Sequence, residues 1–98
     1  YGDGVIKVIF TPGHTPGHQS VLVNLPKTGH MLFTGDACYT GDHWCDKCLP
    51  GLVASSSDAA DSVKKLRRIA KEHDAKVVWG HDPITWKDWK KAPMFYYD

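Results

Sequence analysis

The 98-residue chain is 42% hydrophobic and 23% charged, a composition typical of a small globular domain. Twelve Lys and Arg residues nearly balance eleven Asp and Glu residues, leaving a net charge of +1, so we expect neither nucleic acid nor an anionic membrane as a partner. No apolar run approaches the roughly 18 residues that a membrane-spanning helix requires, so the sequence predicts no transmembrane helix.

The start of the sequence and its cysteines bear on the origin of the chain. It begins at Tyr1, without a methionine, and enters a predicted strand within a few residues. We therefore interpret it as a piece of a longer protein, in which any export signal lies upstream. Three cysteines are too few, and odd in number, for a disulfide framework, which favours a reducing cytoplasm as the location.

The first part of the chain predicts three strands. Residues 5–10 form a short β-branched run, and residues 19–25 and 30–34 follow as two further strands. Between the first two, residues 11–17 contain two prolines and two glycines, which predict a tight loop. Residues 26–29 form the turn of a hairpin between the second and third strands.

The second part predicts an irregular segment, a helix and a strand. Residues 35–56 are rich in Gly, Asp, Cys and Trp and are expected to be irregular. Residues 57–73 predict the one clear helix, with Ser56 or Ser57 as its N-cap. Its apolar residues recur at helical spacing, at Ala59, Val63, Leu66, Ile69 and Ala70.

A fourth strand at residues 75–79 is followed by a short helix within residues 84–91. The predicted order, β-β-β-α-β, indicates an α/β fold in which one sheet carries a helix on one face. Residues 1–98 contain no cue for a domain boundary and are interpreted as a single partial domain. Because the chain offers little to cover the second face of the sheet, half of a larger sandwich fits better than a self-sufficient domain.

Three candidate metal ligands each follow a predicted strand. His14 follows the first strand, Asp36 the third and His81 the fourth. Loops that leave strand ends can converge at one edge of a sheet, and imidazole and carboxylate groups suit zinc or another borderline divalent cation. Taken alone, however, two histidines and an aspartate in loops are more often surface residues or residues satisfied by local hydrogen bonds.

The motifs around these residues resemble a known family. The runs T-P-G-H-T-P-G-H-Q-S at 11–20, T-G-D-A at 34–37 and W-G-H-D at 79–82 resemble, in order, the C-terminal motifs of the metallo-β-lactamase superfamily. Within it, the chain is most similar to the N-acyl homoserine lactonases, which quench quorum signals. The resemblance implies the C-terminal half of an αβ/βα sandwich.

The resemblance also implies roles for individual residues. His14 matches a ligand of the first metal, Asp36 the carboxylate that bridges both metals, and His81 a ligand of the second. The complete site in the parent protein would hold two Zn²⁺ ions, or other divalent metals, with a hydroxide that attacks the lactone carbonyl. Tyr39 matches the tyrosine that points at the substrate carbonyl, and this role is favoured over that of an ordinary half-buried aromatic.

The sequence departs from the family pattern in two places. The signature H-x-H-x-D-H, which supplies the remaining ligands, is absent from the 98 residues, so the chain is not expected to turn over substrate by itself. A run with cysteines at 38, 45 and 48 and a histidine at 43 is also unusual. It is compatible with a structural zinc site, a redox pair or plain loop cysteines, and the last reading is favoured.

Several neighbouring residues have simpler readings. His18 is expected to brace the His14 loop by hydrogen bonding. Asp82 either orients His81 or caps the following turn. The aromatic residues Trp44, Trp86, Trp89 and 95–97 either line an acyl-chain pocket or pack against a neighbouring layer, and packing is favoured.

Three functions follow from these observations. The first is a metal-dependent hydrolase, in the parent protein, that opens an N-acyl homoserine lactone ring. The second is another ester or thioester hydrolase of the same fold, resembling glyoxalase II. The third is a non-catalytic, truncated binding or assembly module. The partner implied by the first two is a small-molecule lactone or ester, and the open sheet face favours self-association or pairing with the missing N-terminal half.

Overall fold

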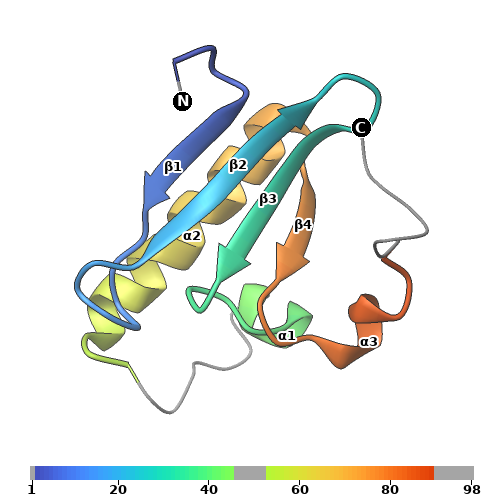
Figure 1. Ribbon diagram of the computed structural model, residues 1–98. Helices are drawn as coiled ribbons and strands as arrows, with labels where there is room; N and C mark the ends of the chain where they lie inside the picture. The colour runs from blue at the N-terminus through green and yellow to red at the C-terminus, as the bar shows by residue number, and fades with distance from the viewer. Residues whose placement is uncertain (1, 46–52, 90–98) are drawn as a thin grey trace.

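The structure is a computed structural model that describes residues 2–45 and 53–89, and its centre is a four-stranded sheet (Figure 1). The strands, in spatial order, are β1 (Ile6–Phe10), β2 (Gln19–Leu25), β3 (Gly29–Gly35) and β4 (Lys76–Trp79). All four predicted strands are present, with ends that differ from the predictions by at most one residue.

The strand directions bring three strand ends to one edge of the sheet. β1 pairs with β2, and β2 with β3, in antiparallel fashion, whereas β3 and β4 are parallel. β1, β3 and β4 therefore run the same way, and their C-terminal ends lie at the same edge (Figure 1). The candidate ligands, which follow these three strands, leave the sheet at that edge.

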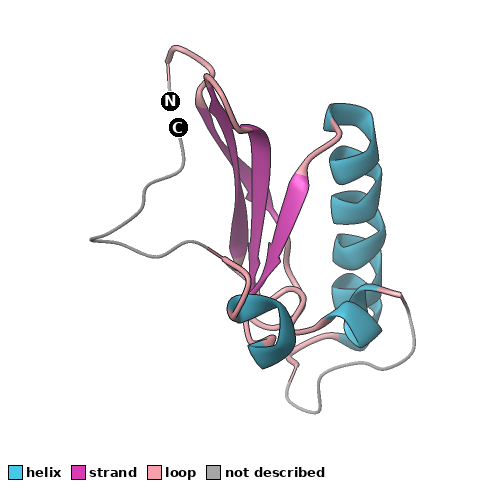
Figure 2. Ribbon diagram, turned by 90° about the vertical axis from the view of Figure 1, so that its right-hand side faces the viewer, coloured by secondary structure: helices cyan, strands magenta, loops and turns pink. Residues whose placement is uncertain are grey.

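One long helix, α2 (Ser56–His73), covers one face of the sheet (Figure 2). The helix begins one residue earlier than predicted, and its N-cap is Ser55 rather than Ser56 or Ser57. Ser55 has an extended backbone, and its side chain accepts a hydrogen bond from the backbone N–H of Asp58 at 3.3 Å. At the other end, Asp74 adopts the left-handed conformation that commonly terminates helices.

Two short helices flank the strand ends. The prediction that residues 35–56 are irregular was wrong at α1 (Gly41–Trp44), which Thr40 caps by accepting a hydrogen bond from the backbone N–H of His43. A helix of four residues is too short to leave a periodic apolar pattern in the sequence. The second, α3 (Pro83–Trp86), is shorter than the helix predicted within residues 84–91, of which 90 and 91 lie outside the described residues.

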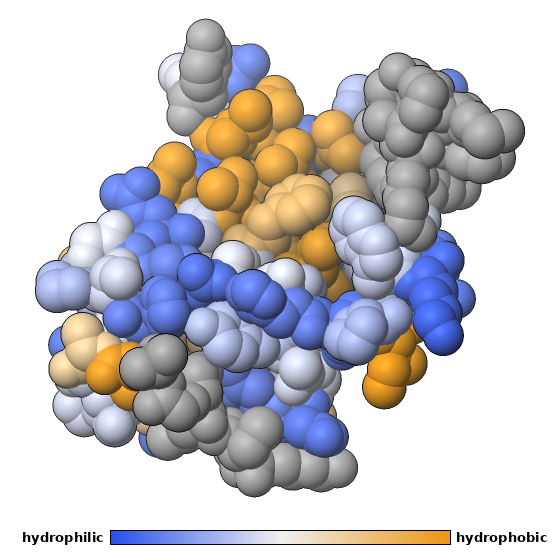
Figure 3. Space-filling view, turned by 60° about the horizontal axis from the view of Figure 1, so that its bottom comes forward, coloured by the Kyte–Doolittle hydropathy of each residue, from blue (hydrophilic) through white to orange (hydrophobic). Residues whose placement is uncertain are grey.

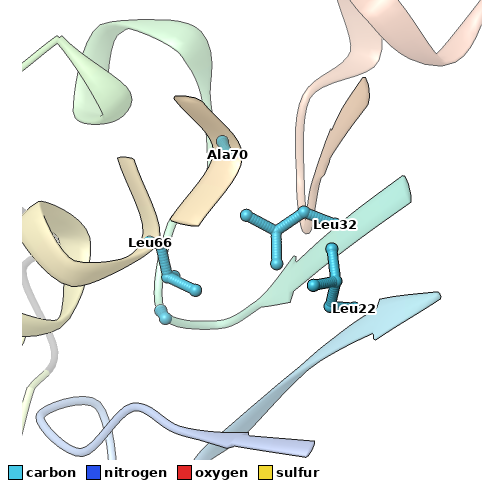
Figure 4. Close-up of a cluster of buried hydrophobic side chains, with 5 residues drawn as sticks. Leu22, Leu32, Leu66 and Ala70 are labelled. Atoms are coloured by element: carbon cyan, nitrogen blue, oxygen red, sulfur yellow. The ribbon is translucent and has the colours of Figure 1, made fainter. Parts of the chain in front are cut away.

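The hydrophobic core lies between the sheet and α2. Leu22 of β2 and Leu32 of β3 are directly opposite each other across the strand pair, and both meet α2 residues (Figure 4). The buried members of the core are Leu22, Leu32, Ala37, Leu66 and Ala70. Each fully buried leucine contributes about 1.5–3 kcal/mol through removal of apolar surface from water. The core positions predicted on the helix are confirmed, except that Ile69 is only partly buried.

The opposite face of the sheet is apolar and partly open. Side chains alternate along β1, so that Ile9 packs against the core while Ile6, Val8 and Phe10 face away from α2 and are exposed. Figure 3 shows apolar side chains gathered in the upper part of the view, above a band of hydrophilic residues. Within residues 2–45 and 53–89, no helix has both the length and the apolar character needed to cross a membrane.

Candidate metal site

The two predicted histidine ligands converge on the third predicted ligand, the carboxylate of Asp36. His14 Nε2 lies 3.4 Å from Asp36 Oδ2, and His81 Nε2 lies 2.8 Å from Asp36 Oδ1. Each oxygen of Asp36 therefore faces a different imidazole. Asp36 and His14 are half-buried, whereas His81 is exposed. The structure thus brings together the residues that the sequence placed at three separate strand ends.

The loop that carries His14 is fixed against the start of α2. Gly13 has a positive φ of 140°, and a Cβ atom there would lie 2.4 Å from the Cα atom of Ala59, so only glycine allows this approach. Two hydrogen bonds hold the contact: Ser55 N–H donates to the Gly13 carbonyl at 3.0 Å, and the Ser62 hydroxyl donates to the Pro12 carbonyl at 2.6 Å. The start of the helix therefore sets the position of His14.

His81 is held by an extension of the sheet beyond β4. The backbone N–H of Gly80 donates to the carbonyl of Cys38 at 3.1 Å, and that of His81 donates to the carbonyl of Tyr39 at 3.0 Å. These bonds tie the segment after β4 to the segment after β3, which places His81 beside Asp36.

Tyr39 lies between the two histidines. Its hydroxyl is 3.4 Å from His14 Nδ1, and its ring centroid is 4.4 Å from that of His81. The backbone N–H of Tyr39 donates to Nδ1 of His43, a buried residue of α1. The contact of His43 with Tyr39 was not predicted, because it depends on α1, whose four residues leave no pattern in the sequence.

Asp82 caps α3 rather than contacting His81. Its Oδ1 atom accepts hydrogen bonds from the backbone N–H groups of Ile84, at 3.0 Å, and Thr85, at 3.3 Å. Its Oδ2 atom accepts a bond from the backbone N–H of Gly41 at 3.2 Å. The capping alternative is therefore the one that the structure supports, and Asp82 also ties α3 to the start of α1.

The cysteine-rich loop is only partly described. Cys38 is buried and Cys45 exposed, and within the described residues neither takes part in a disulfide. Cys48 lies outside the described residues, so a metal or redox role that includes it stays a prediction. Across residues 2–45 and 53–89, no set of three or more His, Cys, Asp or Glu side chains is grouped so as to hold one metal ion.

Two hollows adjoin the site and the open sheet face. One, of about 340 Å³, is lined by residues that follow β4, His81 and Trp86 among them. The other, of about 310 Å³, is apolar and lies between the open sheet face and two tryptophans, Trp86 and Trp89. Trp44 packs against the core, and residues 95–97 lie outside the described part of the chain.

Comparisons with known proteins show the family and the fold of the chain. The model of the metallo-beta-lactamase superfamily matches residues 1–81. The N-acyl homoserine lactonase AttM of Rhizobium radiobacter is 59% identical over 96 residues, which are 98% of this chain and 36% of that protein. The chain therefore spans little more than a third of the length of this relative.

Solved structures show the same fold. An N-acyl homoserine lactone hydrolase with the product N-hexanoyl-L-homoserine bound at its catalytic metal center matches 92% of this chain and 36% of its own, with a TM-score of 0.85 and 31% identity. AidC, a dizinc quorum-quenching lactonase, matches 80% of this chain and 27% of its own at a TM-score of 0.65 and 18% identity, a likeness of fold alone. The α/β fold implied by the motifs is confirmed, and the chain belongs to the metallo-beta-lactamase superfamily.

Proposed function

We propose that this chain supplies part of the active site of a metal-dependent hydrolase that opens the lactone ring of N-acyl homoserine lactones. Residues 1–98 form a single partial domain of that enzyme, and a preceding part carries H-x-H-x-D-H. The observation that supports the proposal is the placement of His14 and His81 against opposite oxygens of Asp36. The relatives named as lactonases support the choice of substrate.

The donor set fits a pair of divalent metals better than a single ion. Two imidazole nitrogens and one carboxylate are groups that zinc accepts. They face one another in pairs across Asp36, with His14 at one carboxylate oxygen and His81 at the other. We assign His14 and Asp36 to one metal, and His81 and Asp36 to the other, with zinc as the first candidate.

The residues of this chain orient the reaction. A pair of divalent metals held by His14, Asp36 and His81 would supply a nucleophilic hydroxide at neutral pH and would stabilise negative charge on the carbonyl oxygen. Asp36 fixes both ligand pairs through its two oxygens. The Tyr39 hydroxyl, beside His14 at 3.4 Å, lies close enough to the site to donate a hydrogen bond to the lactone carbonyl, where it gains strength as charge develops.

Metal content tests the site directly. Elemental mass spectrometry on the complete gene product is expected to show bound zinc that falls in both His14→Ala and His81→Ala. His73→Ala is the matched control, because His73 lies at the far end of α2 and pairs with His30. Zinc that survives both substitutions would contradict the assignment and would point to the cysteines at 38, 45 and 48.

Substrate profiling tests the reaction. We expect the complete gene product to hydrolyse N-acyl homoserine lactones faster than glutathione thioesters. Tyr39→Phe should lower kcat about a hundredfold, the usual cost of losing one donor to a developing oxyanion, with little change in zinc content. Thioester hydrolysis without lactone hydrolysis would instead support a thioester hydrolase that resembles glyoxalase II. Intact metal binding without either activity would support a non-catalytic module.

The remaining expectations concern the surroundings of the enzyme. We propose a small-molecule lactone as the substrate. The open sheet face pairs with the preceding part of the enzyme or, in the isolated chain, with a second copy. The odd number of cysteines continues to favour a cytoplasmic location.

A further inference from the structure

His18 lies at the junction between the loop that carries His14 and the turn that carries Asp36. Its Nε2 atom is 3.0 Å from the backbone nitrogen of Asp36. Its Nδ1 atom is 2.9 Å from the hydroxyl of Thr11, at the end of β1. The ring is also in edge contact with His14, at 6.3 Å between centroids. Both nitrogens of His18 are therefore engaged, one by the turn that carries Asp36 and the other by the residue that follows β1.

The hydrogen bonds continue from His18 through the protein interior. The Thr11 hydroxyl is 2.9 Å from that of Ser20 in β2, and the Ser20 hydroxyl donates to the carbonyl of Thr34 at 3.0 Å. All three of these residues are at most 1% exposed, so water does not compete for their hydroxyl groups. Thr34 is two residues before Asp36, so the chain of bonds begins and ends in the same turn.

The two ends of this chain fix the direction of every bond in it. A backbone N–H can only donate, so the Nε2 atom of His18 accepts from Asp36 and carries no proton. A neutral imidazole then carries its proton on Nδ1, which donates to Thr11. A backbone carbonyl can only accept, so the Ser20 hydroxyl donates its proton to the carbonyl of Thr34. The Ser20 oxygen is then the acceptor in its bond with Thr11, and the Thr11 hydroxyl is the donor.

The turn is shaped to receive the imidazole ring. Gly35, between Thr34 and Asp36, has a positive φ of 57°. A Cβ atom at this position would lie 3.1 Å from Nε2 of His18, tighter than ordinary packing, so the ring sits directly on the backbone of the turn. Hydrogen bonds that point the same way along a chain polarise and strengthen one another in a buried setting.

We propose that His18 is a positioning residue, locked as the Nδ1–H tautomer, which holds the backbone of Asp36 and so keeps its carboxylate between the two candidate histidine ligands. The proposal rests on the proposed metal site for its functional consequence. The tautomer, however, follows from the hydrogen bonds alone. His18 thus does more than brace the His14 loop, because the group that it holds is the carboxylate shared by both ligand pairs.

The first test is nitrogen NMR on the complete gene product labelled with ¹⁵N-histidine, before any metal is added. We expect the His18 ring to show a protonated Nδ1 and an unprotonated Nε2, assigned by loss of its signals in His18→Gln. A His18 ring protonated on Nε2, or on both nitrogens, would overturn the proposal. This reading does not depend on whether the protein binds zinc, so it separates failure of the proposal from failure of the proposed function.

The second test measures zinc affinity in variants of the chain of bonds. Thr11→Val removes both the acceptor of His18 and the donor to Ser20. It should weaken zinc binding about tenfold or more, the usual effect of losing a hydrogen bond that orients a metal ligand. Thr11→Ser keeps both bonds and should bind zinc almost as the unmodified protein does. His18→Gln, whose amide oxygen can accept from Asp36, should retain more affinity than His18→Leu.

A matched control separates positioning from general loss of stability. The Ser62 hydroxyl donates to Pro12, next to Thr11, but lies outside the chain of bonds through His18. Ser62→Ala should therefore destabilise the same loop and leave the His18 tautomer unchanged. Zinc affinity that is equal in Thr11→Val and Thr11→Ser, with both folded by circular dichroism, would overturn the proposal.

Discussion

Gly80 marks the closest approach between the two segments that carry Asp36 and His81. A Cβ atom at Gly80 would lie 2.3 Å from the carbonyl oxygen of Gly35, which is backbone and cannot swing aside. The hydrogen bonds from Gly80 and His81 to the segment after β3 depend on this approach. The absence of a side chain at Gly80 thus permits the contact between the segment after β4 and the turn that carries Asp36.

We predict that Gly80→Ala forces these segments apart. The free energy of unfolding should fall by about 1–3 kcal/mol, the usual cost of overpacking, and zinc affinity should fall with it because His81 moves away from Asp36. Gly17→Ala is the matched control, since a Cβ atom at Gly17 would meet no atom within 4 Å. Urea denaturation of both variants checks this, and equal stability would show that the turn can relax around the added methyl group.

Residue by residue, the sequence predicts where the candidate ligands lie better than it predicts the contacts that hold them in place. His14, Asp36 and His81 could be proposed because each follows a strand, and strands leave a strong local pattern. The contacts of His18 with Asp36 join residues 18 positions apart, and no local pattern encodes such a pair. Asp82 is the converse case, because its capping of α3 was foreseen as one of two local alternatives.

At the scale of elements, the four strands and the long helix were predicted, α3 was predicted with other bounds, and α1 was not predicted. α2 buries Ala59, Val63, Leu66 and Ala70 at the spacing that the sequence displays. α1 has four residues and depends on a cap from Thr40 and a contact with Tyr39, so its formation is a tertiary effect. The N-cap is Ser55 rather than a predicted serine for a related reason, because the Ser55 backbone N–H also donates a hydrogen bond to the Gly13 carbonyl in the His14 loop.

Element order also explains why the site forms at this edge. The C-terminal ends of β1, β3 and β4 meet only because these three strands run in the same direction. β1 and β3 do so because β2 lies between them and is antiparallel to both. β4 then joins β3 in parallel, which requires a crossover connection, and α2 supplies it. The helix therefore serves three purposes, since it connects the strands, covers the core and fixes the His14 loop.

At the scale of the whole molecule, the two faces of the sheet are unequal. One face is buried by α2, whereas the other exposes Val8 at 57%, Phe10 at 54% and Phe33 at 40%. An apolar surface of this kind marks a site of protein contact. This chain spans only 36% of the length of the AttM relative.

We therefore predict that the isolated 98-residue chain self-associates through this face, as seen by sedimentation at increasing concentration. Val8→Thr together with Phe10→Thr should shift the chain toward monomer, because threonine keeps the strand propensity while removing apolar surface. Ile84→Thr is the matched control, as Ile84 is 78% exposed but belongs to α3 rather than to the sheet. A monomeric chain with a sharp calorimetric melting transition would contradict the prediction.

The same double substitution distinguishes between the two ways in which the face is covered. If a preceding layer packs on it in the complete gene product, the two threonines should leave that protein's oligomeric state unchanged and lower its melting temperature, because buried apolar contacts are lost. If a second copy packs on it there too, the threonines should dissociate the oligomer. The first outcome is the one we expect, since it places both halves of the metal site in a single polypeptide.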